Sequence, residues 1–198
     1  MSHSEPESLT VRKRRATKAR IAASAARLAG IHGVSNTTVD QIAAAADVAR
    51  ATFFRYYDTK ESAVAEGITG PWLTLVTAAI ARQPEDLPAK EALVAAFGEL
   101  AREFPAHRAQ IRELARLGRA SPTLCAWTAQ AYQRYENAIA ELLAPRFPTR
   151  PDHDPRPRLL AALAMAAVRI SLDDWIHHGG ALPTLIHTAL NAISIEPR

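Results

Sequence analysis

The feature that most limits how this chain can fold is a pair of short, closely spaced helical segments between residues 38 and 56. Thr38 and Gln41 have the spacing of a capping box, in which each side chain bonds the other residue's backbone N–H, so a helix is predicted to begin there. Asp47-Val48 interrupts it, and a second short helix is predicted over about 50–56. Helices this short are unstable alone, so both must pack on longer ones.

Longer amphipathic segments flank the pair on both sides. A helix is predicted over 17–32, ended by Gly33, and another over about 60–82, where Asp58-Thr59-Lys60-Glu61 has the character of a helix start. The predicted inner face of the 17–32 helix consists of Ile21, Ser24, Ala25 and Leu28.

The rest of the chain also favours helix over strand. Alanine is frequent, glycine is scarce (8 of 198 residues), and no segment alternates apolar with polar residues. We therefore predict an all-α fold of about nine helices. Pro105 is expected to interrupt the helical pattern, and the proline-rich segment 145–157 to be an irregular loop. The remaining helices are predicted over 89–104, 107–118, 123–144, 158–178 and 183–193.

Positive charge is concentrated in the first third of the chain. Residues 1–60 hold ten Lys/Arg and five Asp/Glu, whereas residues 61–198 carry a net charge of −1. Such a segment can displace counterions from nucleic acid, although a basic run such as Arg12–Arg15 can equally serve solubility. The predicted organisation is a flexible basic arm (1–14), a three-helix unit (15–60) and a larger helical unit (61–198).

A short helix, a tight turn and a second short helix bearing Arg, Thr and aromatic residues form the pattern of a helix-turn-helix. Arg50 and Arg55 can bond guanine in bidentate fashion, and Thr52 can bond phosphate or touch a thymine methyl group. Tyr56 can donate its hydroxyl to phosphate, and Lys60 adds charge at a helix start. Phe53 is expected in the core.

The sequence of residues 15–64 resembles the N-terminal domain of the TetR family, through Thr17–Ile21, Gly33–Ala43 and Ala46–Glu61. The Thr-Phe-Phe-Arg-Tyr variant and the Ala-rich C-terminal half are also similar to actinobacterial-type members, including regulators tied to mycofactocin or acyl-CoA metabolism. The resemblance implies a three-helix DNA-binding domain, a helical ligand-binding and dimerisation domain, and repression relieved by a small molecule. It implies DNA contacts by Thr37, Thr38, Arg50, Ala51, Thr52, Phe54, Arg55, Tyr56 and Lys60.

Three positions depart from the family pattern. Ala49 stands where Ser often caps the recognition helix, so that cap must come from elsewhere or be absent. Phe54 stands where Tyr is common, which removes a hydroxyl contact to phosphate, and Tyr57 replaces a usual Phe. These departures leave the operator sequence undefined.

Two C-terminal helices are the predicted homodimer interface. The stretch 159–168 is apolar on every side, so a helix there must be covered all round, by its own core or by a partner. The helix over 183–193 carries an apolar stripe, and paired hairpins of this kind form four-helix interfaces. Burial within one subunit is the competing interpretation. The stripe consists of Leu182, Leu185, Ile186, Ala189 and Ile193.

A pocket for a small hydrophobic or acyl-type effector is expected in the C-terminal unit. Arg169 is the one charge between Leu159 and Asp173, and it can either bind a ligand anion or pair with Asp173 four residues on. Each aromatic candidate has core packing as its ordinary explanation. The candidate pocket residues are Phe97, Phe104, Trp127, Met165 and Arg169. Trp72 and Tyr132 are further bulky residues of the same kind on the central helices.

Catalytic chemistry is not indicated. His177 and His178 are adjacent and point about 100° apart on a helix, so they cannot chelate one metal together. We expect no catalytic residues, no metal, no cofactor and no membrane partner, and a cytoplasmic protein without a disulfide, since Cys125 is its one cysteine. The alternatives to a ligand-responsive repressor of palindromic operator DNA are a helical small-molecule-binding module with a vestigial DNA-binding domain, and an all-helical enzyme.

Overall fold

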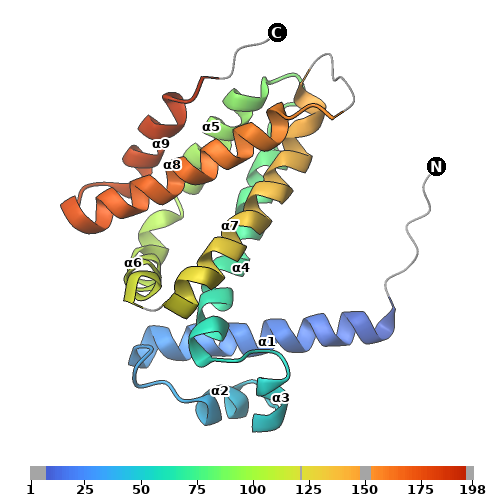
Figure 1. Cartoon of the computed structure of the whole chain (residues 1–198), viewed down its shortest axis with the longest axis vertical. Helices are drawn as coiled ribbons and strands as arrows, with labels where there is room; N and C mark the ends of the chain where they lie inside the picture. The colour runs from blue at the N-terminus through green and yellow to red at the C-terminus, as the bar shows by residue number, and fades with distance from the viewer. Residues whose placement is uncertain (1–7, 121, 148–152, 195–198) are drawn as a thin grey trace. The chain divides into compact units, whose positions relative to one another are not determined.

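The computed structural model describes residues 8–120, 122–147 and 153–194, and these residues form nine α-helices and one short 3-10 helix, with no strand among them (Figure 1). The all-α prediction is therefore confirmed. The chain divides into two compact units, Met1–Gly70 and Pro71–Arg198. This boundary lies ten residues beyond the predicted one, because the start of the fourth helix buries Ala63, Val64 and Ile68 within the first unit.

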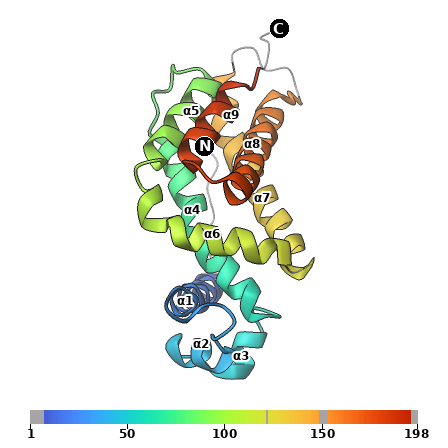
Figure 2. The ribbon, with the colours of Figure 1, turned by 90° about the vertical axis from the view of Figure 1, so that its left-hand side faces the viewer.

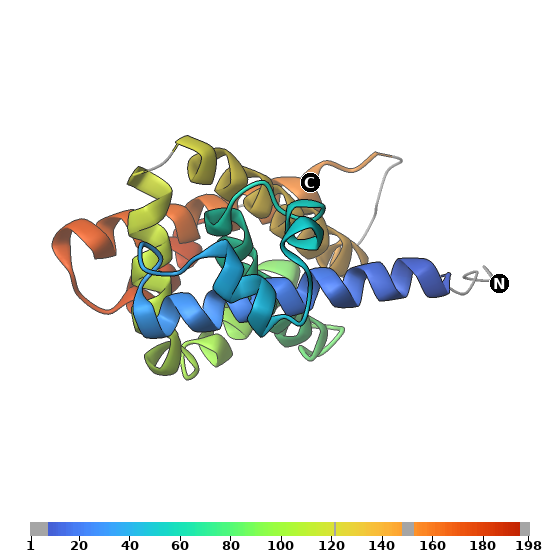
Figure 3. The same ribbon diagram turned by 90° about the horizontal axis from the view of Figure 1, so that it is seen from below.

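The first unit consists of α1 (Leu9–His32), α2 (Val39–Ala45), α3 (Arg50–Phe54) and the beginning of α4 (Lys60–Ala81). Figure 3 shows the two short helices, α2 and α3, beside α1. Phe53 is fully buried, as predicted, and its ring lies 5.9 Å from that of Tyr57. The other buried apolar residues of α1 to α3 are Ile21, Ala22, Ala25, Ala26, Ala29, Ile42 and Ala43.

The first helix is longer than predicted. It begins at Leu9 rather than near residue 17, and the side chain of Ser8 caps it by accepting a hydrogen bond from the Val11 N–H at 3.4 Å. The basic run Arg12–Arg15 is therefore exposed helix, not a flexible arm. The extra two turns bury no side chain, so they have no apolar periodicity by which the sequence could reveal them. Residues 1–7 of the predicted arm lie outside the described part of the chain.

Helices α1 and α4 approach each other closely at Gly67. A Cβ atom added to Gly67 would lie 2.0 Å from the carbonyl oxygen of Ala22 and 2.8 Å from the Cβ of Ala26. The backbone of α4 therefore lies directly against α1, and only glycine fits at this position.

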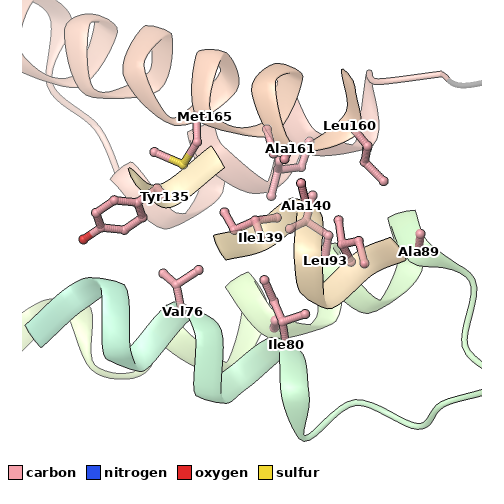
Figure 4. Close-up of a cluster of buried hydrophobic side chains, with 14 of the residues drawn as sticks. Val76, Ile80, Ala89, Leu93, Tyr135, Ile139, Ala140, Leu160, Ala161 and Met165 are labelled. Carbon is pink, nitrogen blue, oxygen red and sulfur yellow. The ribbon is translucent and has the colours of Figure 1, made fainter. Parts of the chain in front are cut away.

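The second unit contains the remainder of α4 and the later helices. Figure 4 shows its core, in which Val76, Ile80, Leu93, Ile139 and Leu160 meet from four different helices. Figure 2 shows α6 running across near the C-terminal end of α8. The helices are α5 (Ala89–Leu100), α6 (Phe104–Ala120), α7 (Pro122–Leu143), the 3-10 helix η1 (Ala144–Arg146), α8 (Arg156–His178) and α9 (Leu182–Asn191).

Prolines in this unit mark helix starts. Pro122 is the first residue of α7 and Pro183 lies in the first turn of α9. Pro105 does not interrupt a helix, contrary to the prediction. It lies in the first turn of α6, where its missing N–H has no intrahelical acceptor to lose.

The guanidinium group of Arg146 holds the loop between α4 and α5. Its nitrogens donate to four backbone carbonyls: Leu87 at 3.1 Å, Gln83 at 2.8 Å, Ile80 at 3.4 Å, and Pro84. A planar fork of donors suits such convergent carbonyls. One side chain thus binds a carbonyl of the last turn of α4 and three carbonyls of the loop that follows it.

Helix α4 is long and apolar enough, by length and composition alone, to cross a membrane. Its apolar residues are instead used in the two protein cores. Val64, Ala65 and Ile68 are buried in the first unit, and Val76 and Ile80 in the second. Its apolar character is explained by this burial.

Candidate nucleic-acid interface

The start of α2 has the predicted capping box. The Gln41 N–H donates to the Thr38 hydroxyl oxygen at 3.2 Å, and the Thr38 N–H donates to the Gln41 side-chain oxygen at 2.9 Å. Thr38 is exposed. Because its oxygen is the acceptor in this box, its O–H can still donate to a phosphate.

Thr37 lies next to this cap but faces inward. Its side chain is fully buried, and its hydroxyl donates to the Gly33 carbonyl at 2.9 Å. This corrects the expectation of a phosphate contact from the Thr37 side chain, because the hydroxyl closes the turn between α1 and α2 instead.

A short turn joins α2 to α3. Asp47 adopts a left-handed backbone conformation (φ 51°), which Asp tolerates better than most residues. The Arg20 Nε donates to the Ala46 carbonyl at 3.2 Å and so ties the turn to α1. Ala49 precedes α3 without a side-chain cap, so of the two alternatives the absent cap is the one found. The orientation of α3 therefore depends on its packing rather than on its cap.

Helix α3 has one buried anchor, and the opposite side is exposed. Phe53 is buried, whereas Arg50, Ala51, Phe54 and Arg55 are exposed. Phe54 has 45% of its surface exposed, which is unusual for a residue of this size. The half-buried residues beside this face are Thr52 and Tyr56.

The Arg50 side chain is held in place by two neighbours. Its Nη1 lies 2.6 Å from Asp40 Oδ1 on α2, and its Cζ lies 5.5 Å from the centre of the Phe54 ring. Both members of the ion pair are largely exposed, at 58% for Arg50 and 68% for Asp40. Sequence reasoning missed Asp40, because a charge in the first turn of α2 is already explained by the helix dipole.

The ammonium group of Lys60, at the start of α4, binds backbone carbonyl groups of the same unit. Its Nζ donates to the carbonyls of Val34 (2.8 Å), Ser35 (3.2 Å) and Thr37 (2.7 Å). An ammonium group has three N–H donors, so all of them are used. The side chain ties α4 to the loop that precedes α2.

The predicted ligand residues lie in separate surroundings in the second unit. Met165 is buried in the core cluster, and Arg169 is exposed with its Nη1 3.9 Å from Asp173, the ion-pair alternative. Phe97 lines a shallow groove between α5 and α9 with Gly98, Ala101, Pro183, Thr184 and His187. Trp127 is half-buried, with the Arg134 Cζ 5.3 Å from its ring centre, and Phe104 contacts Trp175.

Comparison with known proteins identifies both units. Residues 21–66 match the family described as bacterial regulatory proteins, tetR family, and residues 87–196 match the MftR C-terminal domain. The HTH-type transcriptional regulator TcmR of Streptomyces glaucescens is 30% identical over 202 residues, covering 95% of this chain and 87% of TcmR.

Solved structures show the same fold. FadR of Thermus thermophilus, a TetR-family repressor solved with lauroyl-CoA, superposes with a TM-score of 0.65 at 22% identity, covering 90% of this chain and 96% of FadR. A TetR regulator from Rhodococcus sp. RHA1 gives 0.64 at 13% identity, covering 90% of this chain and 96% of that one. The chain therefore belongs to the TetR family of transcriptional regulators, with a helix-turn-helix DNA-binding domain followed by a ligand-binding domain.

Proposed function

We propose that the protein is a homodimeric repressor that binds a palindromic operator and leaves it when a small effector binds the C-terminal unit. The observation that carries the proposal is the exposed face of α3. A helix anchored by one buried phenylalanine presents two arginines, an alanine and an aromatic ring to solvent, on a braced helix-turn-helix. This is the composition of a major-groove reading surface.

The residues of this surface divide by chemistry. Arg50 and Arg55 reach guanine edges, while Ala51 and Phe54 supply apolar contact to thymine methyl groups. Thr38, Thr52 and Tyr56 donate hydroxyl protons to phosphate and set the register. We assign Lys60 to positioning the loop before α2, because its donors are already engaged by carbonyls.

Dimerisation is proposed through α8 and α9. One side of α8 packs in the core through Leu160, Ala164 and other residues, but Leu159, Leu163 and Ile170 are 51%, 38% and 50% exposed. Their spacing of four and seven residues places them in one stripe along the helix. In a two-fold symmetric dimer, the stripes of the two subunits would cover each other. Such a dimer carries two recognition helices, one for each half-site of the operator.

Effector control requires a difference in affinity between two states. For a hundredfold loss of operator affinity, the effector must bind the released state more tightly by about 2.7 kcal/mol. Helix α4 contributes to both units, so we propose that it transmits the change.

A gel shift at fixed salt tests the function. The protein is mixed with the DNA upstream of its own gene and with an unrelated duplex of equal length. Arg50→Ala tests the reading face, and Arg82→Ala is the matched control, because Arg82 is an equally exposed arginine of the second unit that pairs with Glu99.

Selective binding that is lost in Arg50→Ala and kept in Arg82→Ala is the expected result. Binding to both duplexes alike, with no effect of Arg50→Ala, would overturn operator recognition and favour a small-molecule-binding module with a vestigial DNA-binding domain. Sedimentation of Leu163→Glu tests the dimer: a charge in the stripe should give monomers.

A further inference from the structure

An unusual cluster surrounds Trp175, near the C-terminal end of α8. Trp175 is fully buried, and its indole N–H has no hydrogen-bond partner within the described part of the chain. The ring of Phe104 lies 5.5 Å away at an interplanar angle of 73°. A buried polar hydrogen without an acceptor costs on the order of 1–3 kcal/mol, so the site calls for an acceptor that the described residues do not supply.

Two arginines of α6 lie over the same ring. The Cζ of Arg112 is 5.0 Å and that of Arg108 is 5.9 Å from the Trp175 ring centre (Figure 2 shows the crossing of α6 and α8). They are one helical turn apart, and both are exposed. Among the described residues, neither forms an ion pair with a carboxylate. Two positive charges are thus gathered at one aromatic ring, and no carboxylate of the described ranges pairs with either of them.

We propose that this cluster binds the carboxylate of an effector with an apolar body. The guanidinium groups of Arg108 and Arg112 offer planar forks of donors that match a carboxylate, and the indole N–H of Trp175 adds a further donor. The half-buried ring of Phe104 provides apolar surface beside the charged group. A carboxylate therefore satisfies both needs of the cluster, an acceptor for the N–H and a negative charge for the arginines.

Sequence reasoning named Phe104, and it offered Arg169 either as a ligand anchor or as the ion-pair partner of Asp173. Arg169 pairs with Asp173 on an exposed face of α8. Arg108 and Arg112 carry no sequence signal of their own, because a polar helix rich in arginine is ordinarily a solvated helix. Only the crossing of α6 over α8 reveals that their partner is a buried tryptophan.

The inference rests on the proposed effector response and is tested by titration calorimetry of the full-length protein. The probe is octanoate, with octan-1-ol as its uncharged match and acetate as the anion without an apolar body. Trp175→Phe removes the N–H and keeps an aromatic ring, and Arg112→Gln removes one charge. Arg134→Gln is the matched control for Arg112→Gln, since the Arg134 Cζ lies 5.3 Å from the Trp127 ring centre on α7, in the same manner.

Octanoate is expected to bind at least about tenfold more tightly than octanol or acetate. Trp175→Phe and Arg112→Gln should each weaken octanoate binding about tenfold. Arg112→Gln should leave octanol binding unchanged, because octanol carries no charge, and Arg134→Gln should bind as the wild type does. Arg112→Lys, which keeps the charge, should recover part of the affinity. Thermal melts confirm that each variant is folded.

No octanoate binding, or equal binding by wild type, Trp175→Phe and Arg112→Gln, would overturn the site. The parallel gel shift separates this failure from that of the proposed function. If the protein binds its operator and octanoate has no effect, the proposed repressor function stands and the carboxylate site is wrong. If octanoate binds but no operator does, the carboxylate site stands and the proposed repressor function is wrong.

Discussion

Replacing Gly67 by alanine tests the closest contact of the DNA-binding unit. The new Cβ would lie 2.0 Å from the Ala22 carbonyl oxygen, where ordinary van der Waals contact begins at 3.4 Å. The obstacle is backbone, so no side-chain rotation relieves it. Helices α1 and α4 must separate by about 1.4 Å at this point, which is that difference.

Two opposing effects set the magnitude. Overpacking of a close contact costs typically 1–3 kcal/mol, and the backbone obstacle places Gly67→Ala at the upper end. Replacing glycine by alanine inside a helix stabilises the folded state by about 1 kcal/mol, because alanine has the higher helix propensity. The expected net loss is about 2 kcal/mol, which lowers the melting temperature of a unit of this size by roughly 10 °C.

The assay must distinguish the two units. Trp72, Trp127 and Trp175 all lie in the second unit, so tryptophan fluorescence follows that unit alone. Amide hydrogen exchange of α1 to α3 follows the first unit, and Gly67→Ala should speed exchange there. Gly70→Ala is the control: an added Cβ at that position of α4 meets nothing within 4 Å, so it should stabilise by up to about 1 kcal/mol.

Two results would contradict this expectation. One is amide exchange in α1 to α3 that is as slow in Gly67→Ala as in the wild type, and the other is the same exchange in both glycine variants. Either result would mean that α1 and α4 are farther apart than the contact with Ala22 implies.

Three further predictions concern single side chains. Lys60→Gln should weaken operator binding without changing the slope of log K against log salt, whereas a loss of about 0.9 in the slope would show that Lys60 contacts phosphate after all. Asp40→Asn should release Arg50 and relax base preference in a competition gel shift, and unchanged preference would show that the ion pair has no orienting role. Hydrogen bonds from Arg82 and Gln83 lower the pKa of Glu99, so its stabilising contribution is present at neutral pH and lost as pH falls through that lowered pKa. The melting difference between wild type and Glu99→Gln should therefore shrink in acid, and a constant difference would exclude the linkage.

Local signals predicted much of the DNA-binding unit from sequence. The capping box of Thr38 and Gln41, the missing cap at Ala49 and the buried Phe53 each depend on residues within a few positions of one another. The extent of α1 was underestimated, because helix propensity and the Ser8 cap extend it where no apolar face exists.

Contacts between distant residues could not be predicted. Lys60 reaches carbonyls 23 to 26 positions earlier, and Trp175 meets arginines of another helix. Such pairs depend on helix crossings that no local pattern specifies. Met165 lies in the core, although it was a candidate pocket residue. The sequence pattern of a large apolar residue is the same whether the residue lines a pocket or packs in a core.

Helix α4 is continuous in its backbone but has a natural joint. Pro71 lacks the N–H that would bond the Gly67 carbonyl, Gly70 precedes it, and no residue between Ile68 and Val76 is fully buried. The buried residues of the first unit therefore end at Ile68 and those of the second begin at Val76, with Trp72, Leu73 and Leu75 only partly buried between them. A gene fusion made at Gly70-Pro71 would exchange one unit while leaving the buried residues of the other intact, so new sensing units can be recombined onto the same DNA reader at this position.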